Sequence, residues 1–373
     1  MALPSILEYF KFIRMIRKEM AEPINPSTLR ILSFGAGAIG SYIAGSLALH
    51  GSQVVFLETK PVIEELRRRG LRLEIGGQSF SIQQPRLYDS LVNAMQEGPF
   101  DFVLFALKSY DTRSAIEGIL ASQADLPPIL CLQNGVDNEP TLAAAFGMDK
   151  VIAGTVTSSI GRRAAGDIVL ERLRGVGIAG SHPLSERLVT AFNQAGLNAR
   201  RYENAADMKW SKLLTNLPAN ATSAILNMSP AQIFNHPGLF RLEIQQLREA
   251  LAVMAAQHIS LVDLPGTPVR LFGFSIRWLP GFLARQVLRK AIGSGRGGKM
   301  PSFHIDLYSG RGKSEVNYLN GAVADYGERL GIKTQANRFL TDTLLALTRN
   351  QLPLNTYTNK PEKLLEDFRS VYF

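Results

Sequence analysis

Six residues, Gly35 to Gly40, have the types and the spacing that bind a diphosphate. They read Gly-Ala-Gly-Ala-Ile-Gly, after an apolar run (31–34) typical of a buried parallel strand and before a helical pattern (41–50). In this setting Gly35 permits a tight turn, Gly37 lets the backbone approach a pyrophosphate, and Gly40 lets the helix pack closely on the strand. The first N–H groups of the helix point at the phosphates. We therefore predict a dinucleotide-binding turn formed by Gly35, Ala36, Gly37, Ala38, Ile39 and Gly40. An ordinary strand–helix turn that binds nothing is the alternative.

A lysine and two asparagines recur at helical spacing in the second half of the chain. Lys212 and Asn216 are one turn apart on one helix face, and Asn220 is a further turn along. Pro218 lies between the asparagines and should break or kink the helix. Such a stripe is unusual among leucines. It is either part of a polar site or a solvated helix face, and this stretch alone leaves both open.

The end of the second predicted strand bears on the choice of cofactor. Glu58 follows the apolar residues 53–57, and an acid there accepts hydrogen bonds from the adenosine ribose and repels a 2′-phosphate. Glu58 therefore favours NADH over NADPH. Lys60, two residues on, could pair with that phosphate and weakens the preference.

Polar residues also end two later predicted strands. Lys108 follows the apolar run 100–107, and Asn134 follows 128–132. Side chains at the carboxyl ends of parallel strands line the ligand crevice of an open α/β sheet. Both residues are therefore candidates for lining that crevice; a solvated lysine and an Asn-Gly turn are the alternatives.

Composition fits a globular protein of two domains. The chain has 373 residues, of which 46% are hydrophobic and 20% charged, and its one cysteine, Cys131, lies in an apolar run that suits a buried thiol. The five histidines lack metal-ligand spacing, so we predict no metal. Without a membrane-length apolar run or a signal peptide, we expect a cytoplasmic protein.

The net charge of +9 is concentrated in two segments. Residues 266–300 hold seven cations and no acid, and residues 1–30 account for the remaining +2. No nucleic-acid motif occurs in either, so we predict no nucleic-acid partner. The basic segment mixes its cations with aromatic and aliphatic residues. It is either an ordered flap beside the substrate, which we favour, or a membrane-surface contact.

The order of predicted elements divides the chain near residue 203. An amphipathic leader, 1–28, precedes a Rossmann-type α/β domain, 29–203, and an all-helical domain, 204–373, contains the basic insertion. Within the α/β domain we predict a hairpin across Gly76-Gly77 and further strands at 151–160 and 168–178, with Gly161 and Gly175 as punctuation. Helical patterns follow, including one over 313–330.

Six motifs, in order, resemble those of the ketopantoate reductase family (2-dehydropantoate 2-reductases). They are GAGAIG at Gly35, ALKSYDT at Lys108, LQNGVDNE at Asn134, WSKLLTNLPAN at Lys212, PSFHID at Ser302 and KSEVNYLNGAVADYGERLGI at Glu315. The resemblance covers roughly residues 29–265 and 300–350. Two positions depart from the family: Thr59 stands where an arginine is common, which weakens the case for NADPH, and Ala221 stands where a proline usually follows the second asparagine.

The resemblance implies a role for each motif. Lys212 is the general acid, and Glu315 binds the substrate hydroxyl and helps to orient that lysine. Lys108 and Asn134 hold the ribose and nicotinamide side of the cofactor, and Asp306 is a candidate for supporting the geometry of the active site. The substrate's carboxylate and hydroxyl are held by Asn216, Asn220 and Ser302.

The implied reaction is NAD(P)H-dependent reduction of a 2-keto acid to a 2-hydroxy acid, with ketopantoate to pantoate as first choice, in a cleft between the domains. A nearby ammonium favours this reaction because it stabilises the oxyanion that forms as hydride reaches the keto carbon. Another 2-hydroxy or β-hydroxy acid dehydrogenase is the alternative enzyme. A dinucleotide-sensing or scaffolding protein is the non-enzyme alternative. The oligomeric state, a homodimer included, stays open.

Overall fold

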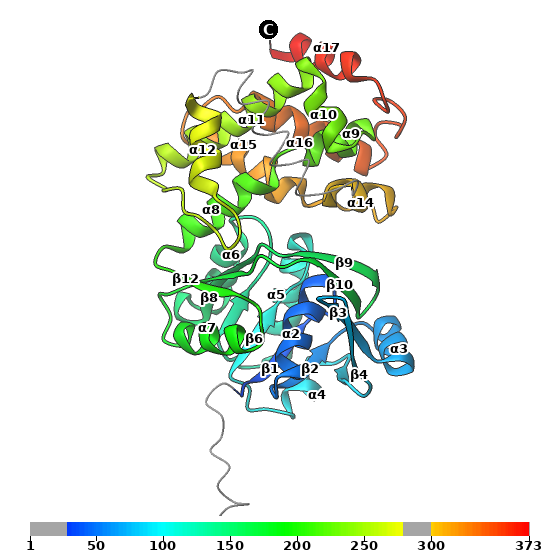
Figure 1. The fold of residues 1–373 in the computed structure, drawn as a ribbon, viewed down its shortest axis with the longest axis vertical. Helices are drawn as coiled ribbons and strands as arrows, with labels where there is room; N and C mark the ends of the chain where they lie inside the picture. Colours follow the sequence, from blue (N-terminus) through cyan, green and yellow to red (C-terminus); the bar gives the residue numbers. More distant parts are fainter. Residues whose placement is uncertain (1–27, 279–299, 373) are drawn as a thin grey trace, which may run out of the picture.

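The computed structural model describes residues 28–278 and 300–372. Nearly all of the predicted leader, and the predicted flap beyond Trp278, lie outside the described residues. The described chain forms two lobes, a sheet lobe up to Tyr202 and a helical lobe from Ala205 (Figure 1). The exact division at residue 203 remains our proposal for the domain boundary.

The sheet lobe is built on eight strands in the order β12-β11-β8-β7-β6-β1-β2-β5. The strands from β8 to β5 are parallel, whereas β11 runs antiparallel to β8 and parallel to β12. Their bounds are β1 Arg30–Phe34, β2 Gln53–Leu57, β5 Arg86–Tyr88, β6 Phe102–Phe105, β7 Ile129–Cys131, β8 Val151–Val156, β11 Val176–Ala179 and β12 Ala199–Tyr202. This is the predicted Rossmann-type arrangement, with the ends of β1, β2, β6 and β7 on one edge.

Helices cover both faces of this sheet because its strands are apolar on both sides. Ile31 belongs to a core with Tyr42 of α2 (Ala38–Leu49) and Phe192 of α7 (Ser185–Gln194). Its neighbour Leu32 belongs to the core on the other face with Ile116. The helices of that second face are α4 Leu91–Met95, α5 Thr112–Ser122 and α6 Asn138–Phe146, and α3 (Lys60–Arg69) follows β2. Alternate residues of a buried parallel strand thus supply two separate cores.

A second, four-stranded sheet contacts α2 and corrects our strand prediction. Its order is β4-β3-β10-β9, with β3 Leu71–Ile75, β4 Gln78–Ile82, β9 Ser159–Ala164 and β10 Asp167–Arg172. The hairpin across Gly76-Gly77 is confirmed. The strands predicted at 151–160 and 168–178 are wrong as continuous elements, because each range contains parts of two strands in different sheets. The chain leaves the large sheet at Thr157 and rejoins it at Gly175, where Thr157 N donates to Gly175 O. A strand-like pattern in the sequence does not reveal such a change of sheet.

The helical lobe packs around a long helix, α11 (Pro237–Ala256), as Figure 1 shows. Its other helices are α8 Ala205–Asn216, α9 Asn220–Leu226, α10 Pro230–Asn235, α12 Val269–Trp278, α14 Ser302–Tyr308, α15 Asn320–Arg329, α16 Gln335–Thr348 and α17 Pro361–Tyr372. The helix predicted from Lys313 is wrong at its start, because a 3₁₀ turn, Glu315–Tyr318, precedes α15. In the described ranges no helix is both long and apolar enough to cross a membrane.

The break predicted at Pro218 is present. α8 ends at Asn216, Ala219 adopts a positive φ of 54°, and α9 begins at Asn220. The two asparagines therefore lie on consecutive helices rather than along one helix.

Candidate active site

The glycine turn has the geometry that its sequence requires. Gly35 has a φ of 95°, in the region that favours glycine. A Cβ on Gly40 would lie 2.0 Å from the Gly35 carbonyl oxygen, so only glycine fits where α2 meets β1. A Cβ on Gly37 would meet nothing within 4 Å. The turn is therefore tight where it packs and open at Gly37, which fits a diphosphate approaching the backbone.

Glu58 lies against this turn. Its Oε1 accepts a hydrogen bond of 2.6 Å from the N–H of Ala36, and its Oε2 accepts one of 3.0 Å from the N–H of Thr59. Lys60 is exposed and pairs loosely with Asp89 at 3.8 Å. The Glu58 carboxylate is thus fixed beside the glycine turn, while the Lys60 side chain remains in solvent.

Lys108 joins the two lobes through a cluster of charges. Its Nζ lies 2.8 Å from Glu315 Oε2 and 3.0 Å from Asp306 Oδ2. The other oxygen of Glu315 accepts hydrogen bonds from the backbone N–H and the hydroxyl of Ser109, at 3.3 and 3.2 Å. Three of the predicted residues, from a strand end, α14 and the 3₁₀ turn, therefore meet at one point.

One cation between two buried carboxylates shifts the titration of this cluster. Burial by itself lowers the pKa of Lys108, but the charges of Glu315 and Asp306 outweigh burial and raise that pKa above its usual value. Burial raises the pKa of Asp306, and the Lys108 ammonium only partly offsets this effect. The lysine is therefore charged at neutral pH, and Asp306 is the carboxylate that takes up a proton more readily than an ordinary aspartate.

A line of amides connects the cofactor side to the substrate side. Asn216 Nδ2 donates to Asn134 Oδ1 at 3.2 Å across the two lobes. Asn220 Nδ2 donates to the carbonyl oxygen of Asn216 at 3.1 Å and lies 3.4 Å from Ser302 Oγ. The N–H of Phe303 donates to Asn220 Oδ1 at 3.1 Å, which fixes α14 on α9. A row of four predicted residues thus runs in space from the loop after β7 to the start of α14.

Lys212 is carried by α8, the helix that begins the helical lobe. The Asn204 side chain caps this helix by accepting hydrogen bonds from Ala206 N and Asp207 N. Lys212 is half-buried and lies one turn before Asn216. Helical spacing therefore puts its ammonium-bearing side chain on the same face as an asparagine that reaches the end of β7.

Sequence reasoning missed several polar residues of this region. Ser109 donates from its hydroxyl to the carbonyl oxygen of Asn134 at 2.8 Å and contacts Glu315. Lys209 is buried and forms an ion pair of 2.7 Å with Glu139. Ser109 lies inside the ALKSYDT motif beside Lys108, and Lys209 directly precedes the WSKLLTNLPAN motif, three residues before Lys212. Their burial was the missing signal, because a serine and a second lysine next to predicted site residues look like solvated neighbours.

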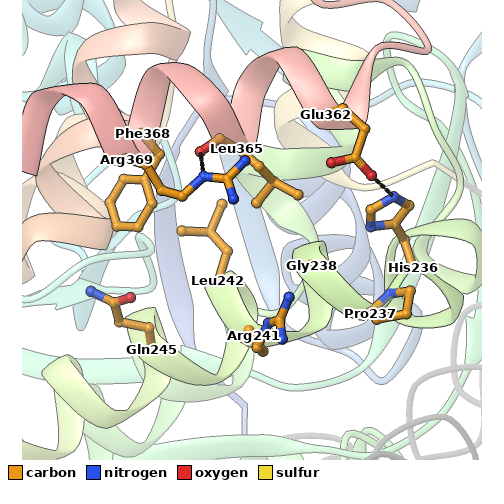
Figure 2. A pocket seen from close by; sticks show the side chains of 10 residues that line it. All are labelled: His236, Pro237, Gly238, Arg241, Leu242, Gln245, Glu362, Leu365, Phe368 and Arg369. Carbon is orange, nitrogen blue, oxygen red and sulfur yellow. Dashed lines mark hydrogen bonds and ion pairs between the residues drawn. The ribbon is translucent and has the colours of Figure 1, made fainter. Parts of the chain in front are cut away.

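A separate pocket of about 320 Å³ lies at the far end of the helical lobe. It is lined by residues at the start of α11 and along α17, with His236 Nε2 3.1 Å from Glu362 Oε1 (Figure 2). Its wall also includes Arg241, Leu242, Leu365, Phe368 and Arg369. None of the residues predicted for binding or catalysis lines this pocket, so it does not belong to the site described above.

Family comparison agrees with the order of motifs. Residues 31–181 match the family described as "Ketopantoate reductase PanE/ApbA", and residues 204–348 match its "C terminal" part. The chain belongs to the ketopantoate reductase family. It is an NAD(P)H-dependent oxidoreductase of that family, which removes the sensing or scaffolding alternative.

Individual relatives span nearly the same length. A 2-dehydropantoate 2-reductase from Pyrococcus horikoshii is 25% identical over 84% of this chain and 95% of its own length. One from Archaeoglobus fulgidus is 26% identical over 86% of this chain and 97% of its own.

Solved structures of ketopantoate reductases share the fold. One from Ralstonia eutropha JMP134 superposes with a TM-score of 0.73 at 25% identity, covering 87% of this chain and 99% of that chain. A 2-dehydropantoate 2-reductase from Geobacter metallireducens GS-15 gives 0.70 at 26% identity, with 85% and 99% covered. The predicted order of a Rossmann-type lobe followed by a helical lobe is therefore confirmed.

Proposed function

We propose that this enzyme reduces 2-dehydropantoate (ketopantoate) to pantoate at the boundary between its two lobes. The observation that carries the proposal is the convergence of the line Asn134–Asn216–Asn220–Ser302 with the charged cluster of Lys108, Asp306 and Glu315. Lys212 stands one turn from Asn216 in that line. Amide and hydroxyl donors suit a carboxylate and a hydroxyl, and an ammonium beside them suits a carbonyl that becomes an alkoxide.

The cofactor fits the glycine turn. Gly35 to Gly40 would hold its diphosphate at the start of α2, because the open position at Gly37 and the free first turn of the helix admit phosphate oxygens. Lys108 and Asn134 would hold the ribose and nicotinamide side. When bound there, NAD(P)H supplies the hydride.

Lys212 supplies the proton in this proposal. As hydride reaches the keto carbon, the carbonyl oxygen becomes an alkoxide and takes a proton from the Lys212 ammonium, so that the ketone becomes an alcohol. The positive charge also stabilises the oxyanion before the proton moves. Two functions, electrostatic and acid, thus fall to one side chain.

The remaining polar residues orient the substrate. We assign its carboxylate and hydroxyl to Asn216, Asn220 and Ser302, and its hydroxyl also to Glu315, whose carboxylate is buried beside Lys108. Because Glu315 is held by Ser109 and Lys108, it keeps one orientation without substrate. A fixed acceptor lowers the entropy cost of binding.

The cofactor preference follows from Glu58 and stays with NADH. Its carboxylate is fixed at the glycine turn, where it repels a 2′-phosphate, and Lys60 points into solvent toward Asp89. A cytoplasmic location and the absence of a nucleic-acid partner remain predictions, and a homodimer remains one of the open oligomeric states.

A panel of substrates tests the proposal. The decrease in absorbance of NADH and of NADPH would be followed with ketopantoate, pyruvate, 2-ketoisovalerate and phenylglyoxylate. We expect the highest kcat/KM with ketopantoate. A higher kcat/KM for another 2-keto acid would mean that this acid, and not ketopantoate, is the substrate of the same reaction. If none of the acids led to oxidation of NADH or NADPH, the proposed reaction class would be contradicted.

A further inference from the structure

A second lysine of α8 is buried between the lobes. The Lys209 side chain is 5% exposed, and its Nζ lies 2.6 Å from the carbonyl oxygen of Gln133, 3.2 Å from that of Gly154 and 2.7 Å from Glu139 Oε1. These three acceptors belong to the loop after β7, to β8 and to α6. One ammonium from the helical lobe therefore contacts three elements of the sheet lobe.

An apolar core lies around Lys209 and its polar contacts. Its neighbours in sequence, Met208 and Trp210, are buried in the same core as Val136 and Ala153 of the sheet lobe. The Glu139 side chain is 12% exposed, and neither of its oxygens accepts a hydrogen bond of standard geometry from the described residues. The close ion pair with Lys209 is thus what compensates its charge. Burial of such a pair costs desolvation and adds little net stability, so stability alone does not explain it.

The position of Lys209 relative to the proposed proton donor suggests another role. Lys209 lies three residues before Lys212 in α8, and Asn216 lies four residues after Lys212 in the same helix. Lys209 holds the carbonyl of Gln133, and Asn216 donates to Asn134, the next residue of the same loop. The two contacts fix α8 to one loop on both sides of Lys212.

We infer that Lys209 is a positioning residue for proton transfer, which sets the distance of Lys212 from the nicotinamide-side loop at Asn134. This inference rests on the proposed function, because it assumes that Lys212 is the donor. A displacement of about 1 Å at a reacting group can cost on the order of 10²-fold in rate. The carbonyl contacts carry the positioning, and Glu139 supplies the balancing charge.

The test uses the full-length enzyme in four variants. Lys209→Met keeps an unbranched side chain that is one atom shorter and removes its charge. Glu139→Gln removes the partner charge, and the double variant removes both without leaving an unpaired charge. Lys333→Met is the matched control, because Lys333 is exposed on the loop between α15 and α16. The folded fraction, the Kd for NADH and NADPH, kcat, and the isotope effect with 4-deuterated cofactor would be measured for each.

We expect the double variant to fold and to bind cofactor like the parent. Its kcat should still fall by roughly 10²-fold, with a changed isotope effect, because the two carbonyl contacts are lost. Lys209→Met should show the same loss of kcat with lower stability, and Lys333→Met should match the parent.

Two results would overturn the inference. One is a kcat within about threefold of the parent in the double variant, and the other is a loss of activity that only tracks the unfolded fraction. A parent enzyme that reduces no 2-keto acid would instead refute the proposed function, so the two failures are distinguishable.

Discussion

At the scale of residues, the site is organised by charge balance. Lys108 lies between Glu315 and Asp306, and both carboxylates are almost fully buried. One cation cannot neutralise two carboxylates, and burial penalises the excess charge. Asp306 bears this penalty, as its raised pKa indicates. The sequence motif named Asp306 as a supporting residue, but only the fold brings it to Lys108.

The raised pKa of Asp306 predicts that the free energy of unfolding falls as pH rises. A carboxyl whose pKa is higher in the folded state than in the unfolded chain favours folding while it is protonated, and that contribution is lost as pH rises through the raised pKa. The free energy of unfolding of the parent should therefore fall, relative to that of Asp306→Asn, between about pH 4 and about pH 7. The difference should change by about 1.4 kcal/mol for each unit of pKa shift. Urea unfolding at the two pH values measures it. The same change in both proteins would show that Lys108 cancels the effect of burial, and a change of opposite sign would show that Lys108 outweighs it.

Glu58 allows a test of cofactor choice at a single side chain. We expect the parent to have a higher kcat/KM with NADH, and Glu58→Ala to shift the ratio toward NADPH, because the repulsion of a 2′-phosphate is removed. Glu58→Gln is the matched variant, since its amide oxygen can still accept from Ala36 N. Initial rates with both cofactors give the ratios. A strong preference of the parent for NADPH would show that the Glu58 carboxylate does not select the cofactor.

At the scale of elements, features fixed by neighbouring residues were predictable from the sequence, and features fixed by distant residues were not. The glycine turn and the break at Pro218 follow from backbone restrictions that act within a few residues, and both are present. The separation of β8 from β9 depends on which sheet a strand joins, and the position of the Glu315 carboxylate depends on Lys108 and Ser109, which lie far from it in the sequence. An apolar or helical pattern in sequence carries no information about either partner.

The close contact of α2 with β1 predicts the effect of one methyl group. Gly40→Ala would place a Cβ 2.0 Å from the Gly35 carbonyl oxygen, so the helix must shift. We expect a loss of about 1–3 kcal/mol in the free energy of unfolding and weaker dinucleotide binding. Gly118→Ala is the control, because Gly118 is exposed in α5 and its Cβ would meet nothing within 4 Å. It should gain about 0.5–1 kcal/mol. Equal effects of the two substitutions in chemical denaturation would contradict the close packing at Gly40.

At the scale of the whole molecule, the two lobes share a continuous core. Val136, Ala153 and Ala179 of the sheet lobe are buried in the same cluster as Leu213 and Leu214 of α8. The helix that carries Lys212 is therefore packed against the sheet edge where the glycine turn and Asn134 lie. Motif order predicted which residues belong to the site. It could not predict that Lys209 would be buried, because burial between the lobes is a property of the assembled molecule.

The central claim is that Lys212 donates the proton in a reduction performed between the lobes. The most direct measurement is the single-turnover rate of ketopantoate reduction by the parent and by Lys212→Ala, with the Kd of the cofactor measured alongside and Lys333→Met as a control for the loss of one lysine. We predict that the parent reduces ketopantoate and that Lys212→Ala binds the cofactor with unchanged affinity. Its rate should fall by roughly 10²- to 10⁴-fold, the range for a general acid. A rate for Lys212→Ala close to that of the parent would contradict the account.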